Sequence, residues 1–226
     1  MTRDELYTQL QTYLEQHLPS YLDLLQQMVA INSFTANADG VNALGKLTAD
    51  RFAGLGFTAE TVPSAVPEYG KHLVLTRSGT SGRQIGLVSH LDTVFPPEEE
   101  WRNNFVWREE GDRIYGPGTV DIKGGTVVIY MMLDALRALL PELFEKITWV
   151  ILIDASEEAE AEDFGRLCIE RLAGPQTLAC LIFEGGQMEG REFLLVVARK
   201  GMAVFRATAE GKASHAGSAH EDGANA

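Results

Sequence analysis

Cysteine and basic residues are both scarce in this chain of 226 residues. It has two cysteines, Cys168 and Cys180, and its 19 lysines and arginines face 32 aspartates and glutamates, for a formal net charge of −13. Nucleic acids and anionic membranes bind basic surfaces, so this charge argues against both as partners. Both cysteines lie among apolar neighbours, which favours two buried free thiols over a disulfide and fits a reducing compartment.

Long apolar runs are also missing from the sequence. None approaches the ~20 residues needed to span a bilayer, and the N-terminal residues 1–5 lack the basic-then-apolar pattern of a secretory signal. We therefore expect a cytoplasmic protein. Hydrophobic residues nevertheless make up 45% of the chain, enough to bury a substantial core.

Apolar residues recur at helical spacing in four parts of the chain. The expected helices cover residues 4–30, 41–53, 124–140 and 163–172. Proline lacks a backbone N–H and clashes with the preceding turn, so we expect Pro19 to split the first helix in two and Pro141 to stop the third. Gly54 and Gly56 close the second.

Runs of β-type residues alternate with these helices. Strands are expected at residues 57–62, 72–77, 84–89, 147–153, 178–183 and 192–198. The second and third flank a turn and are expected to pair as a hairpin, while the apolar runs at 147–153 and 178–183 indicate buried strands. This alternation predicts an α/β layered domain, in which function gathers beyond the carboxyl ends of the strands.

The pattern changes after about residue 199. Residues 202–209 alternate like a half-exposed antiparallel strand, and the motif Gly211–Gly217 follows. The chain stops at Asn225-Ala226, which is not a plausible end for a domain. We therefore expect a first domain over residues 1–198 and the truncated start of a second over residues 199–226.

A histidine and two aspartates form the first group of candidate site residues. His90 and Asp92 are two positions apart, so their side chains share one side of an extended strand, and Asp92 can accept a hydrogen bond from the imidazole. Asp121, in a turn before a helix, could bridge two cations. The alternatives are an ordinary strand-end histidine for His90 and a capping role for each aspartate. Lys123 is expected to be a surface or loop lysine.

Three glutamates at the ends of apolar strands form the second group. Glu157 and Glu158 point in different directions, so one can bind metal while the other takes a proton from water. Glu184 ends the run at residues 178–183. Each could instead belong to a solvated loop. Taken together with His90, however, these carboxylates are the ligand mix that suits a pair of hydrolytic zinc ions.

Five segments in this order resemble the motifs of the M20 family of zinc peptidases and deacylases: Ser89–Val94, Tyr115–Gly125, Ser156–Glu158, Phe183-Glu184 and Lys212–Gly217. That family includes glutamate carboxypeptidase, acetylornithine deacetylase, succinyl-diaminopimelate desuccinylase and aminoacylase. The resemblance implies a three-layer α/β catalytic domain with a mixed central sheet, followed by an α+β lid that forms a homodimer. It also implies cleavage of an amide bond in a small peptide or N-acyl amino acid, with release of a product that carries a carboxylate.

The resemblance also implies a metal site. By it, His90 and Glu158 bind one zinc each or share the pair with Glu184, and Asp121 bridges the two ions, which cobalt or manganese could replace. The peptide bond after Asp121 is expected to be cis.

Catalytic roles follow from the same resemblance. Glu157 is implied as the general base, and Asp92 as the residue that steadies His90. His215 resembles the lid histidine that reaches the active site of the dimer partner and stabilises the oxyanion.

The sequence departs from the family in one major respect. The family's last metal-binding histidine lies far downstream, and none of the five histidines of this chain occupies that place. Residues 1–226 by themselves are therefore expected to be inactive. The continuation Ala159–Glu162 is also more acidic than usual. Two other interpretations remain: a truncated, non-catalytic remnant or metal-binding interaction module, and a mononuclear or metal-free amidohydrolase that uses Glu157 alone.

Overall fold

The computed structural model describes residues 2–159, 162–186, 188–190, 192–194, 205 and 207–224. The chain forms two compact units, Met1–Gly185 and Gly186–Ala226. Among the described residues, no helix combines the length and the apolar character that a membrane crossing requires.

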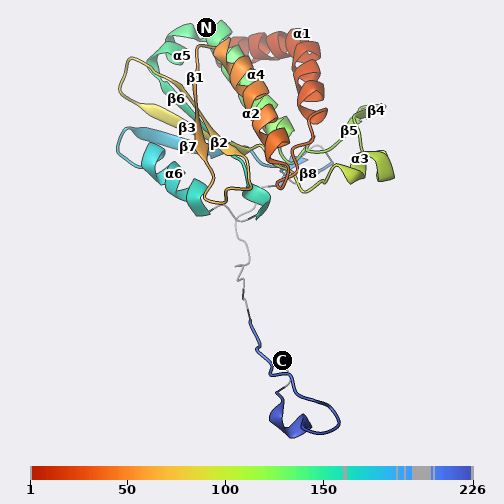
Figure 1. The fold of residues 1–226 in the computed structure, drawn as a ribbon. Coiled ribbons are helices and arrows are strands. Elements are labelled where there is room, and N and C mark those ends of the chain that lie inside the picture. The colour runs from red at the N-terminus through yellow and green to blue at the C-terminus, as the bar shows by residue number, and fades with distance from the viewer. Residues whose placement is uncertain are drawn as a thin grey trace. The chain divides into compact units, whose positions relative to one another are not determined.

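The first unit is an α/β structure (Figure 1). Its described strands are β1 (Thr58–Pro63), β2 (Lys71–Arg77), β3 (Gln84–His90), β4 (Arg108–Glu110), β5 (Arg113–Tyr115), β6 (Thr148–Asp154) and β7 (Thr177–Ile182). Its described helices are α1 (Arg3–Val29), α2 (Ala38–Ala53), α3 (Glu98–Asn103), α4 (Lys123–Leu139), α5 (Pro141–Lys146) and α6 (Glu162–Leu172), with a 3₁₀ turn at Glu157–Ala159. The helices expected at 41–53, 124–140 and 163–172 correspond to α2, α4 and α6.

The central sheet is mixed and has the strand order β1-β2-β6-β3-β7. Strands β1, β2 and β6 are antiparallel neighbours, whereas β3 runs parallel to β6 and β7. The expected hairpin of β2 and β3 is therefore wrong, because β6 lies between them. Strand β6 is buried along nearly its whole length, so a central place removes both of its apolar faces from water. The loop after β2 crosses the start of β6, where the Gly79 amide donates to Thr148 Oγ1 at 2.9 Å.

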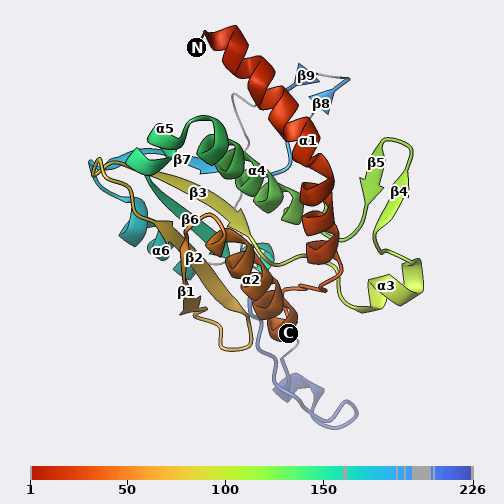
Figure 2. The same cartoon turned by 90° about the horizontal axis from the view of Figure 1, so that it is seen from above.

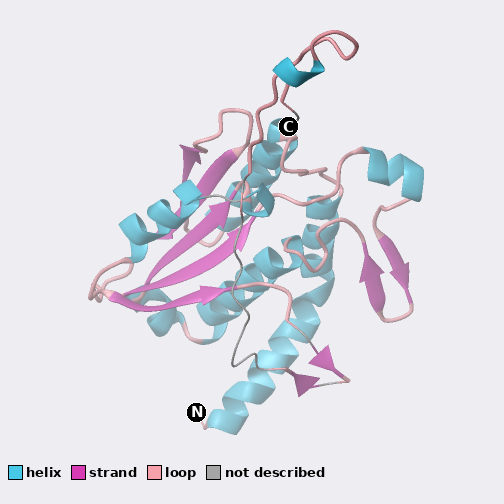
Figure 3. Ribbon diagram, turned by 90° about the horizontal axis from the view of Figure 1, so that it is seen from below, coloured by secondary structure: helices cyan, strands magenta, loops and turns pink. Residues whose placement is uncertain are grey.

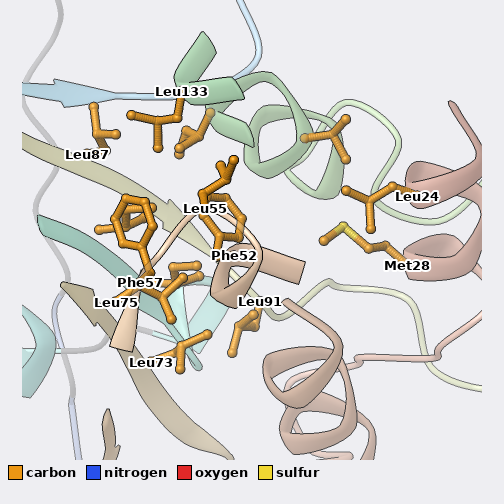
Figure 4. Packing of buried hydrophobic residues seen from close by; sticks show 14 of the residues in the cluster. Leu24, Met28, Phe52, Leu55, Phe57, Leu73, Leu75, Leu87, Leu91 and Leu133 are labelled. Atoms are coloured by element: carbon orange, nitrogen blue, oxygen red, sulfur yellow. The ribbon is translucent and has the colours of Figure 1, made fainter. Parts of the chain in front are cut away.

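Helices cover both faces of this sheet (Figure 3). Because side chains alternate along a strand, Leu73 and Leu75 of β2 join the larger apolar cluster with α1, α2 and α4. Val74 between them joins a smaller cluster with Phe164 and Leu167 of α6. Figure 4 shows the larger cluster, in which Leu75 lies among residues of the helices and neighbouring strands. The sheet between two helical layers confirms the expected α/β class.

Helix α1 is continuous, so the expectation that Pro19 splits it is wrong. A proline inside a helix costs about 3 kcal/mol, and Figure 2 shows α1 changing direction near its middle. Contacts with α4 on both sides of the proline offset this cost. The hydroxyl of Tyr13, before Pro19, donates to Asp134 at 3.0 Å, and that of Tyr21, beyond it, donates to the same carboxylate at 2.8 Å.

Strand β7 forms as expected, but the prediction that it is buried is wrong. It lies at the edge of the sheet, and Leu178 and Ile182 are 49% and 68% exposed within the described part of the chain. For the same reason Cys180 is exposed, not buried, while Cys168 of α6 is partly buried, and both are free thiols. The sequence patterns did not predict helix α3 or the β4–β5 hairpin. Pro141 follows the end of α4, as expected, and is also the first residue of α5.

The second unit has little regular structure among its described residues. It contains β8 (Met188–Glu189), β9 (Glu192–Phe193) and a 3₁₀ turn at His220–Asp222. Most of the strand expected at 192–198 lies outside the described residues, as does much of that expected at 202–209. The expected domain boundary at residues 198–199 also lies there and stays a prediction.

Candidate active site

Three parallel strands end at the same edge of the sheet, and the candidate residues follow them. His90, the last residue of β3, lies opposite Asp154, the last residue of β6. Val88 of β3 lies opposite Ile182 at the end of β7, two residues before Glu184. Residues distant in sequence therefore meet at this edge because of strand register.

The His90 imidazole is buried, with its side chain 1% exposed. Its Nδ1 atom lies 3.0 Å from the backbone oxygen of Asp92 and 3.3 Å from a carboxylate oxygen of the same residue. The backbone oxygen is thus the nearer of the two Asp92 acceptors, and the carboxylate expected from the spacing lies slightly farther from the ring. With Nδ1 engaged, Nε2 is the atom directed at the acidic cluster, at 3.0 Å from Asp121 Oδ1 and 3.7 Å from Glu184 Oε1.

The Asp92 carboxylate is buried and holds the loop that carries the paired glutamates. Its two oxygens accept hydrogen bonds from the backbone amides of Glu157 at 3.1 Å and Glu158 at 3.2 Å. The hydroxyl of Thr35 donates to the same carboxylate at 2.7 Å. Charge-assisted bonds of this kind are stronger than neutral ones. Asp92 therefore fixes the backbone at Glu157 and Glu158 as well as facing His90.

Asp121 precedes α4 and does not cap it, because the N-cap position is Ile122 and carries no side-chain capping bond. The peptide bond between these two residues is cis, as the resemblance led us to expect. The Asp121 side chain is 63% exposed and that of Glu184 is 44% exposed, so both carboxylates are open to a ligand.

Two groups of potential metal ligands share His90. One ligand atom from each of His90, Asp121 and Glu184 lies within 4.8 Å of the others. The same holds for His90, Glu157 and Glu158. Zinc ligands sit about 2 Å from the ion, so donors of one ion lie within about 4 Å of each other. An imidazole nitrogen with several carboxylates at this spacing is a donor set that fits zinc after small side-chain adjustments.

The acidic cluster shifts the protonation of its members. Burial opposes the charged imidazole, but the hydrogen bond and charge of Asp92, with Glu184 and Glu157, raise the pKa of His90 to about 9. Burial and then the Asp121 charge raise the pKa of Glu158, and burial raises that of Glu184 against the opposing effect of His90. The neighbouring carboxylate charges that contribute to these shifts favour added positive charge, as expected of a cation site.

Lys123 contradicts the expectation of a surface lysine. It is 2% exposed, and its Nζ donates to the backbone oxygen of Ile31 at 2.9 Å. Burial, opposed by the Glu100 charge, lowers the pKa of Lys123 to about 8. The position of Lys123, two residues after the candidate ligand Asp121, was the sequence feature that could have suggested a structural role for this lysine.

His215 belongs to the second unit, where its Nδ1 lies 3.2 Å from the Gly217 amide and 3.0 Å from Ser218 Oγ. Its implied role in a dimer stays a prediction, as do the individual roles of the first-unit residues.

Comparison with known proteins decides the family. The sequence profile of peptidase family M20/M25/M40 matches residues 86–219, more than half of the chain. The chain belongs to this family. Carboxypeptidase G2 from Pseudomonas sp. (strain RS-16) is 33% identical over 209 residues, which cover 92% of this chain and 48% of the relative. Acetylornithine deacetylase from Salmonella arizonae is 35% identical over 147 residues, covering 62% of this chain and 37% of the relative.

Two solved structures share the fold of this chain. Human carnosine dipeptidase 1 superposes with a TM-score of 0.64 at 18% identity, over 77% of this chain and 40% of that one. An M20 family metallo-carboxypeptidase from Sulfolobus solfataricus gives 0.56 at 16% identity, over 74% of this chain and 37% of that one. The chain spans about half the length, or less, of the curated relatives that it matches.

Proposed function

We propose that the M20 chain forms part of a zinc-dependent hydrolase that cleaves an amide or peptide bond and releases an amino acid or another carboxylate-bearing product. The observation that carries this proposal is the approach of His90 Nε2, Asp121 and Glu184 to within 4.8 Å of one another, next to the Glu157–Glu158 pair. Family membership supports it independently.

His90, Asp121, Glu158 and Glu184 are the residues that would hold the metal, two zinc ions in the complete protein, with Asp121 between them. When bound, zinc polarises a carbonyl oxygen and makes water more acidic. His90 presents Nε2 because its Nδ1 is held by the Asp92 backbone. The buried Asp92 carboxylate keeps the two glutamates in place through their amides.

Glu157 is the proposed general base. Its amide is fixed by Asp92, and its side chain lies at the exposed rim of the cluster. There the carboxylate can take a proton from the attacking water and pass it to the leaving amine nitrogen. General acid–base catalysis of this type contributes about 10²–10⁴ in rate.

Relatives support the substrate class. They include a carboxypeptidase and an acetylornithine deacetylase, so we propose small peptides or N-acyl amino acids as substrates. We further propose a cytoplasmic protein and a homodimer formed through a lid that includes residues 199–226, with His215 stabilising the oxyanion in the partner's site.

The test is a hydrolysis assay with dipeptides and N-acetyl amino acids on the complete polypeptide to which these residues belong, with zinc. Turnover that disappears with a chelator and returns with zinc supports the proposal. Turnover that persists without metal favours the metal-free amidohydrolase, and zinc binding without turnover favours the metal-binding module. Residues 1–226 alone are the matched comparison, and we expect them to show no appreciable turnover.

A further inference from the structure

A buried histidine outside the proposed metal cluster contacts both ends of the segment at residues 154–163, called here the acidic loop, which carries Glu157 and Glu158. His72 lies in β2 and is 1% exposed. Its Nδ1 atom lies 3.1 Å from the Ala155 amide and 3.1 Å from Asp154 Oδ1, at the point where β6 ends. Its Nε2 lies 3.0 Å from Asp163 Oδ2 in the first turn of α6. One imidazole therefore bridges the residues on either side of the segment that carries the two glutamates.

This link holds in either protonation state of the ring. A neutral imidazole accepts the Ala155 N–H at Nδ1 and donates from Nε2 to Asp163. A protonated imidazole donates from both nitrogens, to Asp154 at one end and Asp163 at the other. The ring also packs on Phe164 of α6, with centroids 5.3 Å apart.

The loop needs such a link because of its charge. Residues 154–163 read DASEEAEAED, with six acidic residues and no basic one. Like charges at this density repel one another and favour an expanded loop. Asp92 holds only the middle of the segment, through two amides. Asp163 adds a second anchor, because its Oδ2 also accepts the Ala65 amide at 2.6 Å.

We propose that His72 is a positioning residue that, together with Asp163, closes the acidic loop at its two ends and thereby sets Glu157 and Glu158 at the metal site. The inference rests on the proposed function for its consequence at the metal, but the closure of the loop can be tested without metal. His72 packs between β6 and α6 and acts through the loop, not on substrate.

Three substitutions test the two links that His72 makes, to Ala155 and Asp154 at one end and to Asp163 at the other. His72→Leu removes both. His72→Asn keeps an acceptor near the Nδ1 position for the Ala155 amide but is too short to reach Asp163. Of the two links, Asp163→Asn weakens only the hydrogen bond between His72 and residue 163. Tyr21→Phe is the matched control, since it removes a buried hydrogen bond of similar length, to Asp134, at the α1–α4 contact.

The first readout is amide hydrogen exchange in residues 155–159 of the metal-free chain. Loss of one link of this kind corresponds to about a tenfold change in local opening. We expect the Glu157 and Glu158 amides to exchange at least about tenfold faster in His72→Leu, with an intermediate effect in His72→Asn and none in Tyr21→Phe. The second readout is the visible absorption of added Co²⁺, which we expect to change in His72→Leu and to recover in part in His72→Asn.

Unchanged exchange and an unchanged Co²⁺ spectrum in His72→Leu would overturn the proposal, as would an equal effect in Tyr21→Phe. If His72→Leu fails to fold, unchanged exchange in both His72→Asn and Asp163→Asn overturns it equally. Faster exchange in a chain that never gives a Co²⁺ spectrum supports loop closure and counts against the metal site. A normal spectrum that no variant alters supports the metal site and counts against His72.

Discussion

The Nε2 atom of His90 lies 3.0 Å from Oδ1 of Asp121, although 31 positions separate the two residues. Strand β3 delivers the imidazole and the turn before α4 delivers the carboxylate. Two donors of zinc-binding type at this distance, with Glu184 nearby, define the centre of the proposed site.

Substitution of the proposed base separates chemistry from metal binding. In the complete protein, Glu157→Gln preserves shape and removes the proton acceptor, so we expect kcat to fall by about 10²–10⁴. Zinc content measured by mass spectrometry is expected to stay at the wild-type level. Activity within a few-fold of wild type at equal zinc content would show that another group takes the proton.

The Asp92 carboxylate is expected to contribute to stability even without metal. Asp92→Asn turns one acceptor into an N–H donor that faces the backbone amides of Glu157 and Glu158, so we expect a loss of about 1–3 kcal/mol in the free energy of unfolding. Urea denaturation in the presence of chelator measures it. Asp50→Asn, in the exposed Lys46–Asp50 pair, is the control and is expected to cost at most about 0.5 kcal/mol. Equal losses in both variants would contradict the assigned role of Asp92.

The crossing of the loop at Gly79 over the start of β6 gives a test of the strand order. A methyl group at this position would overlap the backbone of Ile147, so we expect Gly79→Ala to destabilise the chain by about 1–3 kcal/mol. Gly165→Ala, on the exposed side of α6 with open space around it, is expected to be neutral or to stabilise by up to about 1 kcal/mol. A Gly79→Ala chain as stable as wild type would contradict this crossing.

The buried His72 predicts a specific dependence of stability on pH. Burial would lower the pKa of His72, but hydrogen bonds to Asp154 and Asp163 raise it. Burial would raise the pKa of Asp163, but the hydrogen bonds from His72 and from the Ala65 amide together lower it. A raised histidine pKa adds stability that is complete below its unfolded value of about 6.5 and is lost as the pH rises through the folded value. A lowered aspartate pKa adds stability that is present above about 3.9 and is lost as the pH falls through the folded value.

The stability difference between wild type and His72→Asn is therefore expected to be largest at about pH 4–6.5. It should shrink toward higher pH in chemical denaturation curves measured at a series of pH values. A difference that stays constant from pH 5 to pH 9 would contradict a charged histidine–aspartate interaction in the folded chain.

Local sequence patterns predicted the elements better than their pairing. The apolar run at 147–153 correctly predicts a strand, because such a run is a local feature of the sequence. The hairpin was wrong because pairing of β2 with β6 depends on a contact between segments more than 70 positions apart. Pro19 predicts a break in the first helix because its cost is local, whereas the contacts of Tyr13 and Tyr21 with Asp134 that offset this cost join distant parts of the chain.

The candidate site shows the same limit. Positions after strand ends led to His90, Glu157, Glu158 and Glu184, since the edge of a parallel sheet gathers such residues. The sequence could not reveal that Asp92 binds the loop amides, and nothing in the local pattern distinguished His72 from any other strand histidine. Both features arise from register between distant strands.

Zinc titration of residues 1–226 by calorimetry tests the central claim most directly. We expect the wild-type chain to bind zinc, and His90→Leu and Asp121→Asn each to weaken binding at least about tenfold, because each loses a donor close to the ion. His17→Gln, which removes an imidazole from α1, is the control and is expected to bind like wild type. A wild-type chain that binds no zinc, or equal affinity in all four proteins, would contradict a metal site at His90.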